Sequence, residues 1–210
     1  MPHVALLGDS IFDNKAYVGS EPDVLGHLRR IAPDGWEFDL LAVDGNLVRH
    51  VSQQLMGLGP DVTHLVVSAG GNNAISNSDI LPMKASTAAE VFSSLADRTE
   101  AFANEYRAML RELAATGLPF AVCTIYYPNF DDPIVQRIAK AALASFNDVI
   151  ITLAAENRVP ILDLRLICNE RTDYANEIEP SGRGGEKIAS AIIAMIEQGI
   201  EFESRSVIYW

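Results

Sequence analysis

The chain has 210 residues, 49% of them apolar, which suffices for one domain with a sizeable buried core and excludes a disordered chain. Its formal net charge of −12 argues against nucleic-acid partners and against attachment to anionic membranes. With neither a charged-then-apolar leader nor an apolar stretch of about 18 residues, we expect a cytoplasmic protein without membrane insertion.

Short apolar runs alternate with longer amphipathic runs along the chain. The short runs predict five buried strands, at 3–8, 36–43, 62–70, 119–127 and 159–164. The longer runs predict helices at 21–32, 46–58, 86–116 (as one helix or two), 132–157 and 184–199. Two helix ends carry specific signals, because Asp132-Pro133 is a good N-cap pair and Gly117 is a good C-cap.

This alternation predicts an α/β fold, with a parallel, doubly wound five-stranded sheet of order 2-1-3-4-5 between two layers of helices. We expect a single domain at 1–200 and a C-terminal tail at 201–210. The tail ends in apolar residues, so it is expected to dock as an edge strand, to pack against a second copy in a homodimer, or to fray.

The chain has two cysteines, Cys123 and Cys168, and both lie within or beside apolar runs. We therefore expect buried free thiols rather than a disulfide. Without a CxxC motif or nearby histidines they make no zinc site, and no metal is expected.

Polar residues stand where the first three predicted strands end. The sequence there reads GDS at 8–10, DGN at 44–46 and GGNN at 70–73. Strands in the order 2-1-3 would bring these three corners together at the carboxyl edge of the sheet, where ligands bind in doubly wound folds. Each corner alone is also an ordinary turn or flexible loop, so their order and spacing carry the functional interpretation.

Acyl transfer requires a hydroxyl nucleophile and hydrogen-bond donors aimed at a developing oxyanion. Ser10 would provide the hydroxyl and its own backbone N–H. Gly45 would offer a second N–H, because no side chain blocks close approach there, and the Asn72 amide would be the third donor.

Four blocks in order resemble the SGNH/GDSL hydrolase superfamily: GDSIFDN, the single Gly45, GGNN at 70–73, and PSGRGGEKIA near the C-terminus. The resemblance implies a flavodoxin-like three-layer sandwich. It also implies hydrolysis of carboxylic esters of lipids, sugars or small acyl compounds through an acyl-serine, with no cofactor. By position, Ser10 matches the nucleophile, and its N–H, Gly45 and Asn72 match the oxyanion hole.

The last block departs from the superfamily pattern, which places Asp-x-x-His before Pro-Ser. Here Glu179 occupies the histidine position and Asn176 the aspartate position. The histidines of the chain offer no substitute, because they lie at strand beginnings or within helices: His3, His64, His27 and His50.

Three hypotheses for Glu179 follow. It is the general base, with a pKa raised above about 4.3 by burial or by a proton shared with Asp173 or Glu177. Alternatively the base is lost, and the protein binds an acyl or glycan ligand without efficient turnover. In the third hypothesis Glu179 is a structural residue at a helix entry.

We favour the first hypothesis, with Asn176 or Asp173 orienting Glu179 and a small-molecule ester as the substrate. Four further residues are expected to contact that substrate: Asp9, Asn73, Tyr126 and Tyr127. Asp9 alternatively fixes its own loop, and the two tyrosines are alternatively core aromatics at a strand end.

Overall fold

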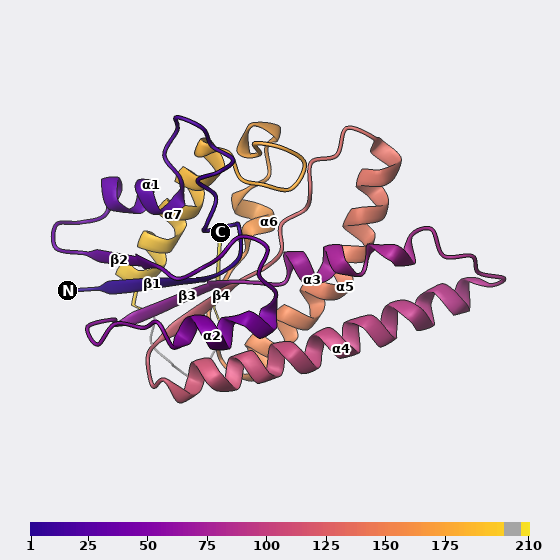
Figure 1. The fold of residues 1–210 in the computed structure, drawn as a ribbon, viewed down its shortest axis with the longest axis horizontal. Helices are drawn as coiled ribbons and strands as arrows, with labels where there is room; N and C mark the ends of the chain where they lie inside the picture. The colour runs from indigo at the N-terminus through magenta and orange to yellow at the C-terminus, as the bar shows by residue number, and fades with distance from the viewer. Residues whose placement is uncertain (200–206) are drawn as a thin grey trace.

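The computed structural model describes residues 1–199 and 207–210, and its centre is a parallel sheet (Figure 1). The strands lie in the order β2-β1-β3-β4-β5-β6. They are β1 (His3–Gly8), β2 (Glu37–Leu40), β3 (His64–Ser68), β4 (Phe120–Cys123), β5 (Ile161–Leu162) and β6 (Ile208–Tyr209). The predicted α/β class and the order of the first five strands are confirmed, and a sixth strand is added.

Helices cover both faces of this sheet. The α-helices are α1 (Val24–Ile31), α2 (Val51–Leu55), α3 (Gly71–Ser76), α4 (Ala88–Ala115), α5 (Pro133–Glu156), α6 (Leu164–Ile167) and α7 (Gly182–Glu197). Short 3₁₀ helices are η1 (Val48–His50), η2 (Ser78–Ile80) and η3 (Arg171–Asp173). Figure 1 shows α1 and α7 on one face and α2, α4 and α5 on the other, with α4 and α5 reaching beyond the sheet.

The two faces of the sheet carry separate hydrophobic cores. Along β1, Val4 and Leu6 pack toward α1 and α7, whereas Ala5 and Leu7 pack toward α4 and α5. All four side chains are fully buried, because successive residues of a strand point to opposite faces. A strand buried on both faces reads as a continuous apolar run, which is why the sequence pattern located it.

Several predicted boundaries need correction. The first helix begins at Val24 rather than near Pro22, because the Asp23 side chain accepts a hydrogen bond from Gly26 N at 2.8 Å and caps the helix. The predicted helix 46–58 is only η1 followed by α2. The Asp132 N-cap of α5 is confirmed. The single helix α4 has Thr116 as its C-cap, and Gly117 follows directly with a φ of +72° that suits a helix end.

The short helices α3 and α6 are not among the predicted elements, and α6 begins at Leu164, the last residue of the predicted strand 159–164. Each starts directly after a strand and is too short to show helical periodicity. Their position matters for function, because α3 carries Asn72 at the carboxyl edge of the sheet.

Part of the predicted tail, 201–206, lies outside the described residues. Its last residues form β6, which pairs parallel with β5 through Ile161 N to Val207 O and Asp163 N to Tyr209 O, both at 2.8 Å. This corresponds to the edge-strand alternative. The expected buried free thiols Cys123 and Cys168 are confirmed.

Candidate active site

The turn after β1 presents Ser10 at the carboxyl edge of the sheet. Gly8 has a φ of +120°, and a Cβ there would stand 1.7 Å from the Ser68 carbonyl oxygen, so glycine is required for β1 to end this close to β3. The Gln54 amide of α2 accepts from Gly8 N at 2.7 Å and donates to Gly8 O at 2.8 Å. The backbone just before Ser10 is therefore fixed on both sides.

Ser10 and Glu179 meet, although the sequence separates them widely. The Ser10 hydroxyl donates a hydrogen bond to Glu179 Oε1 at 3.1 Å. Both residues are buried, with Ser10 7% and Glu179 5% exposed. Among the described residues the second carboxylate oxygen, Oε2, has no hydrogen-bond partner. The predicted convergence of a hydroxyl and a carboxylate is confirmed.

The environment of Glu179 changes its acidity. Burial raises the pKa of its carboxyl from the ordinary 4.5 to about 7, the negative charge of Asp44 acts in the same direction, and the hydrogen bond from Ser10 opposes them. A carboxylate with a pKa near 7 is a far better proton acceptor than a solvated one, yet a large fraction of it remains ionised at neutral pH.

The segment before Glu179 is held by its neighbours. Asn176 Oδ1 accepts from the backbone N–H groups of Ile178 and Glu179, each at 2.9 Å. The Tyr126 hydroxyl donates to the Ile178 carbonyl. Asn176 thus orients the backbone of Glu179 rather than its carboxylate.

Asn14 joins the Ser10 segment to the Glu179 segment. It is fully buried, donates from Nδ2 to Pro180 O at 3.3 Å, and accepts from Val24 N at 3.0 Å. Sequence reasoning missed this residue, although it is the last letter of the GDSIFDN block. Its contacts fix the chain on both sides of the hydroxyl–carboxylate pair.

The three expected oxyanion donors stand on neighbouring corners. Val43 O accepts from Asn46 N at 3.1 Å, which closes a turn with Gly45 at φ +79°. Asn72 Nδ2 donates to Asn46 O at 3.0 Å, so this amide is held against that turn. An amide nitrogen carries two hydrogens, so Asn72 keeps a second one to donate.

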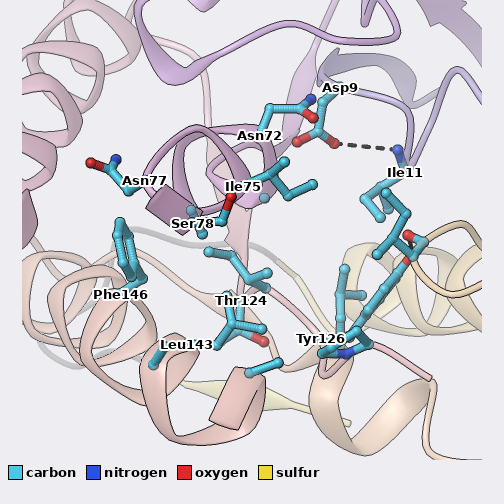
Figure 2. A pocket seen from close by; sticks show the side chains of 18 of the residues that line it. Asp9, Ile11, Asn72, Ile75, Asn77, Ser78, Thr124, Tyr126, Leu143 and Phe146 are labelled. Carbon is cyan, nitrogen blue, oxygen red and sulfur yellow. Dashed lines mark hydrogen bonds between the residues drawn. The ribbon is translucent and has the colours of Figure 1, made fainter. Parts of the chain in front are cut away.

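Asp9 faces the same site from the residue before Ser10. Its carboxylate Oδ1 accepts from Ile11 N at 3.2 Å, the bond drawn in Figure 2. Burial raises the pKa of Asp9 to about 7, and the charge of Glu179 adds to the effect. Asp9 therefore fixes its own loop, as the alternative interpretation held, and it also lines the cavity beside Ser10.

Three predicted site residues have other contacts. Asp173 has no hydrogen bond to Glu179 among the described residues; it instead accepts from Lys187 Nζ at 2.8 Å and from two backbone N–H groups, so it fixes the loop start. Asn73 accepts from Val48 N and donates to Glu105, away from the cavity. Tyr127 lies under the Lys140 ammonium, 4.7 Å from its ring centroid. We correct all three predictions accordingly.

A cavity of about 210 Å³ opens beside the Ser10–Glu179 pair (Figure 2). Ser10, Asn72 and Glu179 line one part of it, together with Asp9 and Tyr126. The rest is lined mainly by aliphatic and aromatic side chains of α3, α4 and α5. The sequence predicted ligand binding at this edge of the sheet but not the shape of the cavity, because its walls come from segments that the fold alone brings together.

Comparisons with known proteins bear on the family and the fold of this chain. Residues 6–185 match the model of the GDSL-like lipase/acylhydrolase family. A search of curated proteins finds no match.

Solved structures share the fold over nearly the whole chain. An extracellular lipase from Streptomyces rimosus is 14% identical, with a TM-score of 0.65 over 94% of this chain and 99% of that one. An esterase from Pseudoalteromonas sp. is 12% identical, with a TM-score of 0.66 over 94% of this chain and 98% of that one. A carbohydrate acetylesterase from Sinorhizobium meliloti is 12% identical, with a TM-score of 0.65 over 94% of this chain and 99% of that one.

Proposed function

The chain belongs to the GDSL-like lipase/acylhydrolase family, and on this premise we propose that it is a serine esterase whose nucleophile is Ser10 and whose general base is Glu179. The observation that carries the proposal is the 3.1 Å hydrogen bond from the Ser10 hydroxyl to the buried Glu179 carboxylate. A nucleophile and its base must lie within hydrogen-bond reach, and this pair does.

In the first half of the reaction, Glu179 takes the proton of the Ser10 hydroxyl while Oγ attacks the ester carbonyl carbon. The oxyanion that forms accepts hydrogen bonds from Ser10 N–H, Gly45 N–H and the Asn72 amide, each donor being worth about 3 kcal/mol in such a site. The carbon–oxygen bond to the alcohol then breaks. Glu179 returns its proton to the departing alkoxide, which leaves an acyl-serine.

The second half repeats these steps with water. Glu179 takes a proton from the water, the hydroxide oxygen attacks the acyl carbon, and the bond to Ser10 Oγ breaks. Glu179 then protonates Oγ, which restores the free enzyme and releases the acid. The pKa of about 7 supports both roles, because the same group must accept a proton and give it back near neutral pH.

A fluorophosphonate probe tests the proposal, because it reacts covalently only with an activated serine. We expect the unaltered protein to be labelled, Ser10→Ala to be unlabelled, and Ser52→Ala, a matched control in an exposed position, to label normally. A folded protein that stays unlabelled, while Glu179→His gains labelling, would instead support the alternative of a binding protein that lacks an effective base.

A further inference from the structure

The cavity beside Ser10 is polar at one end and apolar along the rest of its length. Figure 2 shows Asp9 and Asn72 on one side of it and Leu143 and Phe146 on the other. The apolar walls come from α3, α4 and α5, which contribute Ile75, Leu95 and Leu143 among others. An ester whose carbonyl lies at Ser10 would therefore direct one of its two substituents along an apolar wall.

Several of these wall residues leave much of their surface in water. Ile75 is 47% exposed, Leu81 54%, Val135 40% and Ile178 38%, although all four line the cavity. Large aliphatic side chains gathered around one opening mark a site for an apolar ligand. A hydrocarbon chain in the cavity would cover this surface.

Asn77, Arg98 and Thr124 lie along the apolar part, and their polar side-chain groups are already bonded within the protein. Arg98 pairs with Asp79 and donates to Asn77 O at 3.1 Å, and Thr124 donates to Asp163 Oδ1 at 2.8 Å. A sugar ring needs hydrogen-bonding groups that are free to reach its hydroxyls. This part of the cavity therefore suits a hydrocarbon better than a glycan.

Helix α5 has the length and apolar composition of a membrane-spanning helix. Some of its apolar residues nevertheless have partners within the fold: Val135 and Leu143 line the cavity, and Ile150 and Leu153 lie in the core, whereas Ile134 and Ile138 are exposed. The cavity thus accounts for apolar residues in the first half of α5, where the core does not reach.

We propose that this cavity binds the hydrocarbon chain of the acyl group, so that the substrates are esters of apolar carboxylic acids longer than acetate. The proposal rests on the proposed function, because it takes the ester carbonyl to lie at Ser10. A cavity needs only about 15 Å³ to hold a water molecule. An acetyl methyl would thus leave most of the 210 Å³ unfilled.

The acyl side is assigned rather than the alcohol side because the two substituents have different fates. The acyl chain stays bonded to Ser10 Oγ until hydrolysis, whereas the alcohol must leave and water must reach Glu179. A chain held between α3, α4 and α5 stays in place throughout. The alcohol and the water then exchange at the polar end of the cavity, beside Glu179.

Two isomeric esters, ethyl hexanoate and hexyl acetate, test this assignment with the unaltered enzyme. They have the same atoms and similar leaving alcohols, and they differ in which side carries the chain. We expect kcat/KM, measured by titration of the released acid, to be higher for ethyl hexanoate. From ethyl acetate to ethyl hexanoate it should rise by about fourfold for each added methylene. A preference for hexyl acetate, or no rise from acetate to hexanoate, would overturn the proposal.

Two matched variants test whether the acyl chain lies in this cavity. Ala142 lines the cavity, whereas the nearby Ala144 is exposed and does not. Ala142→Trp should reduce kcat/KM for ethyl hexanoate to near the value for ethyl acetate and leave ethyl acetate little changed. Ala144→Trp should leave both values unchanged. Equal effects of the two variants would contradict the proposal.

Failure of this inference is distinguishable from failure of the proposed function. If no ester is hydrolysed and no probe labels Ser10, the proposed function fails, and calorimetric titration with neutral amides then tests the cavity. Octanamide should bind more tightly than acetamide, and Ala142→Trp should remove the difference. Equal binding of the two amides would overturn the acyl-chain site as well.

Discussion

One loop, between α6 and α7, holds two buried carboxylates with opposite surroundings. Asp173, at the start of the loop, is fully buried and accepts hydrogen bonds from two backbone N–H groups and from Lys187. Glu179, at its end, is 5% exposed, accepts from the Ser10 hydroxyl, and has an oxygen without a partner among the described residues. Asp173 Oδ1 and Glu179 Oε2 each lack a hydrogen-bond partner among the described residues, but Asp173 also pairs with Lys187 and Arg183. Burial is shared, so the charged partners decide the role: a carboxylate paired with cations fixes a loop, and one that faces only a hydroxyl is reactive.

Replacing the reactive carboxylate should have the largest effect. Glu179→Gln keeps the shape but removes the proton acceptor, so we expect kcat/KM for ester hydrolysis to fall by about 10² to 10⁴-fold. Above pH 7 the variant should also unfold at a higher temperature, because the folded-state pKa of Glu179 is raised, and ionisation of the buried group therefore costs stability as the pH rises.

The exposed neighbour Glu177 provides the control for that variant. Glu177→Gln should retain full activity and the melting temperature of the unaltered protein. Unchanged rates in Glu179→Gln would remove Glu179 from the mechanism and leave its burial without a catalytic explanation.

The pH dependence of kcat/KM tests whether Glu179 is the group that must be ionised. Because the base must be ionised and its pKa is about 7, kcat/KM should fall about tenfold for each pH unit below 7 and level off above it. Asp9 also has a pKa of about 7, so Asp9→Asn is needed to separate the two groups. The acid limb should persist in Asp9→Asn and be absent from the residual activity of Glu179→Gln; its loss in Asp9→Asn would assign it to Asp9.

The cation-paired carboxylate of Asp173 should affect stability instead of chemistry. Asp173→Asn removes a charge that two backbone N–H groups and Lys187 face, which should cost about 2 to 3 kcal/mol in the free energy of unfolding. Chemical denaturation measures this loss. The pH midpoint of kcat/KM for the folded variant should stay in place, and a shifted midpoint would show that Asp173 tunes Glu179 after all.

The sequence placed the main elements because two-sided burial leaves a continuous apolar signal in each central strand, as in β1 and β3. Strand order then follows from the doubly wound pattern. The short helix α3 escaped prediction, because glycine and asparagine at 70–73 are equally typical of loops.

Only some of the site residues could be predicted from the sequence. Ser10 and Glu179 were found because they occupy fixed places in ordered blocks, and their hydrogen bond confirms that they meet. Asn73 and Tyr127 were predicted to contact the substrate because they lie at or just after the ends of predicted strands, at the carboxyl edge of the sheet. Adjacent residues of a helix or strand point in different directions, so neighbours in sequence are often not neighbours in a site.

The sequence by itself therefore determined the class of fold, the carboxyl-edge corners and the identity of the two groups that meet there. Tertiary structure alone decided which carboxylate of the α6–α7 loop has no cationic partner among the described residues, and how α3, α4 and α5 enclose an apolar cavity beside it. The physical reason is that desolvation and cavity shape depend on atoms contributed by distant segments. Local sequence patterns do not specify which distant segments supply those atoms.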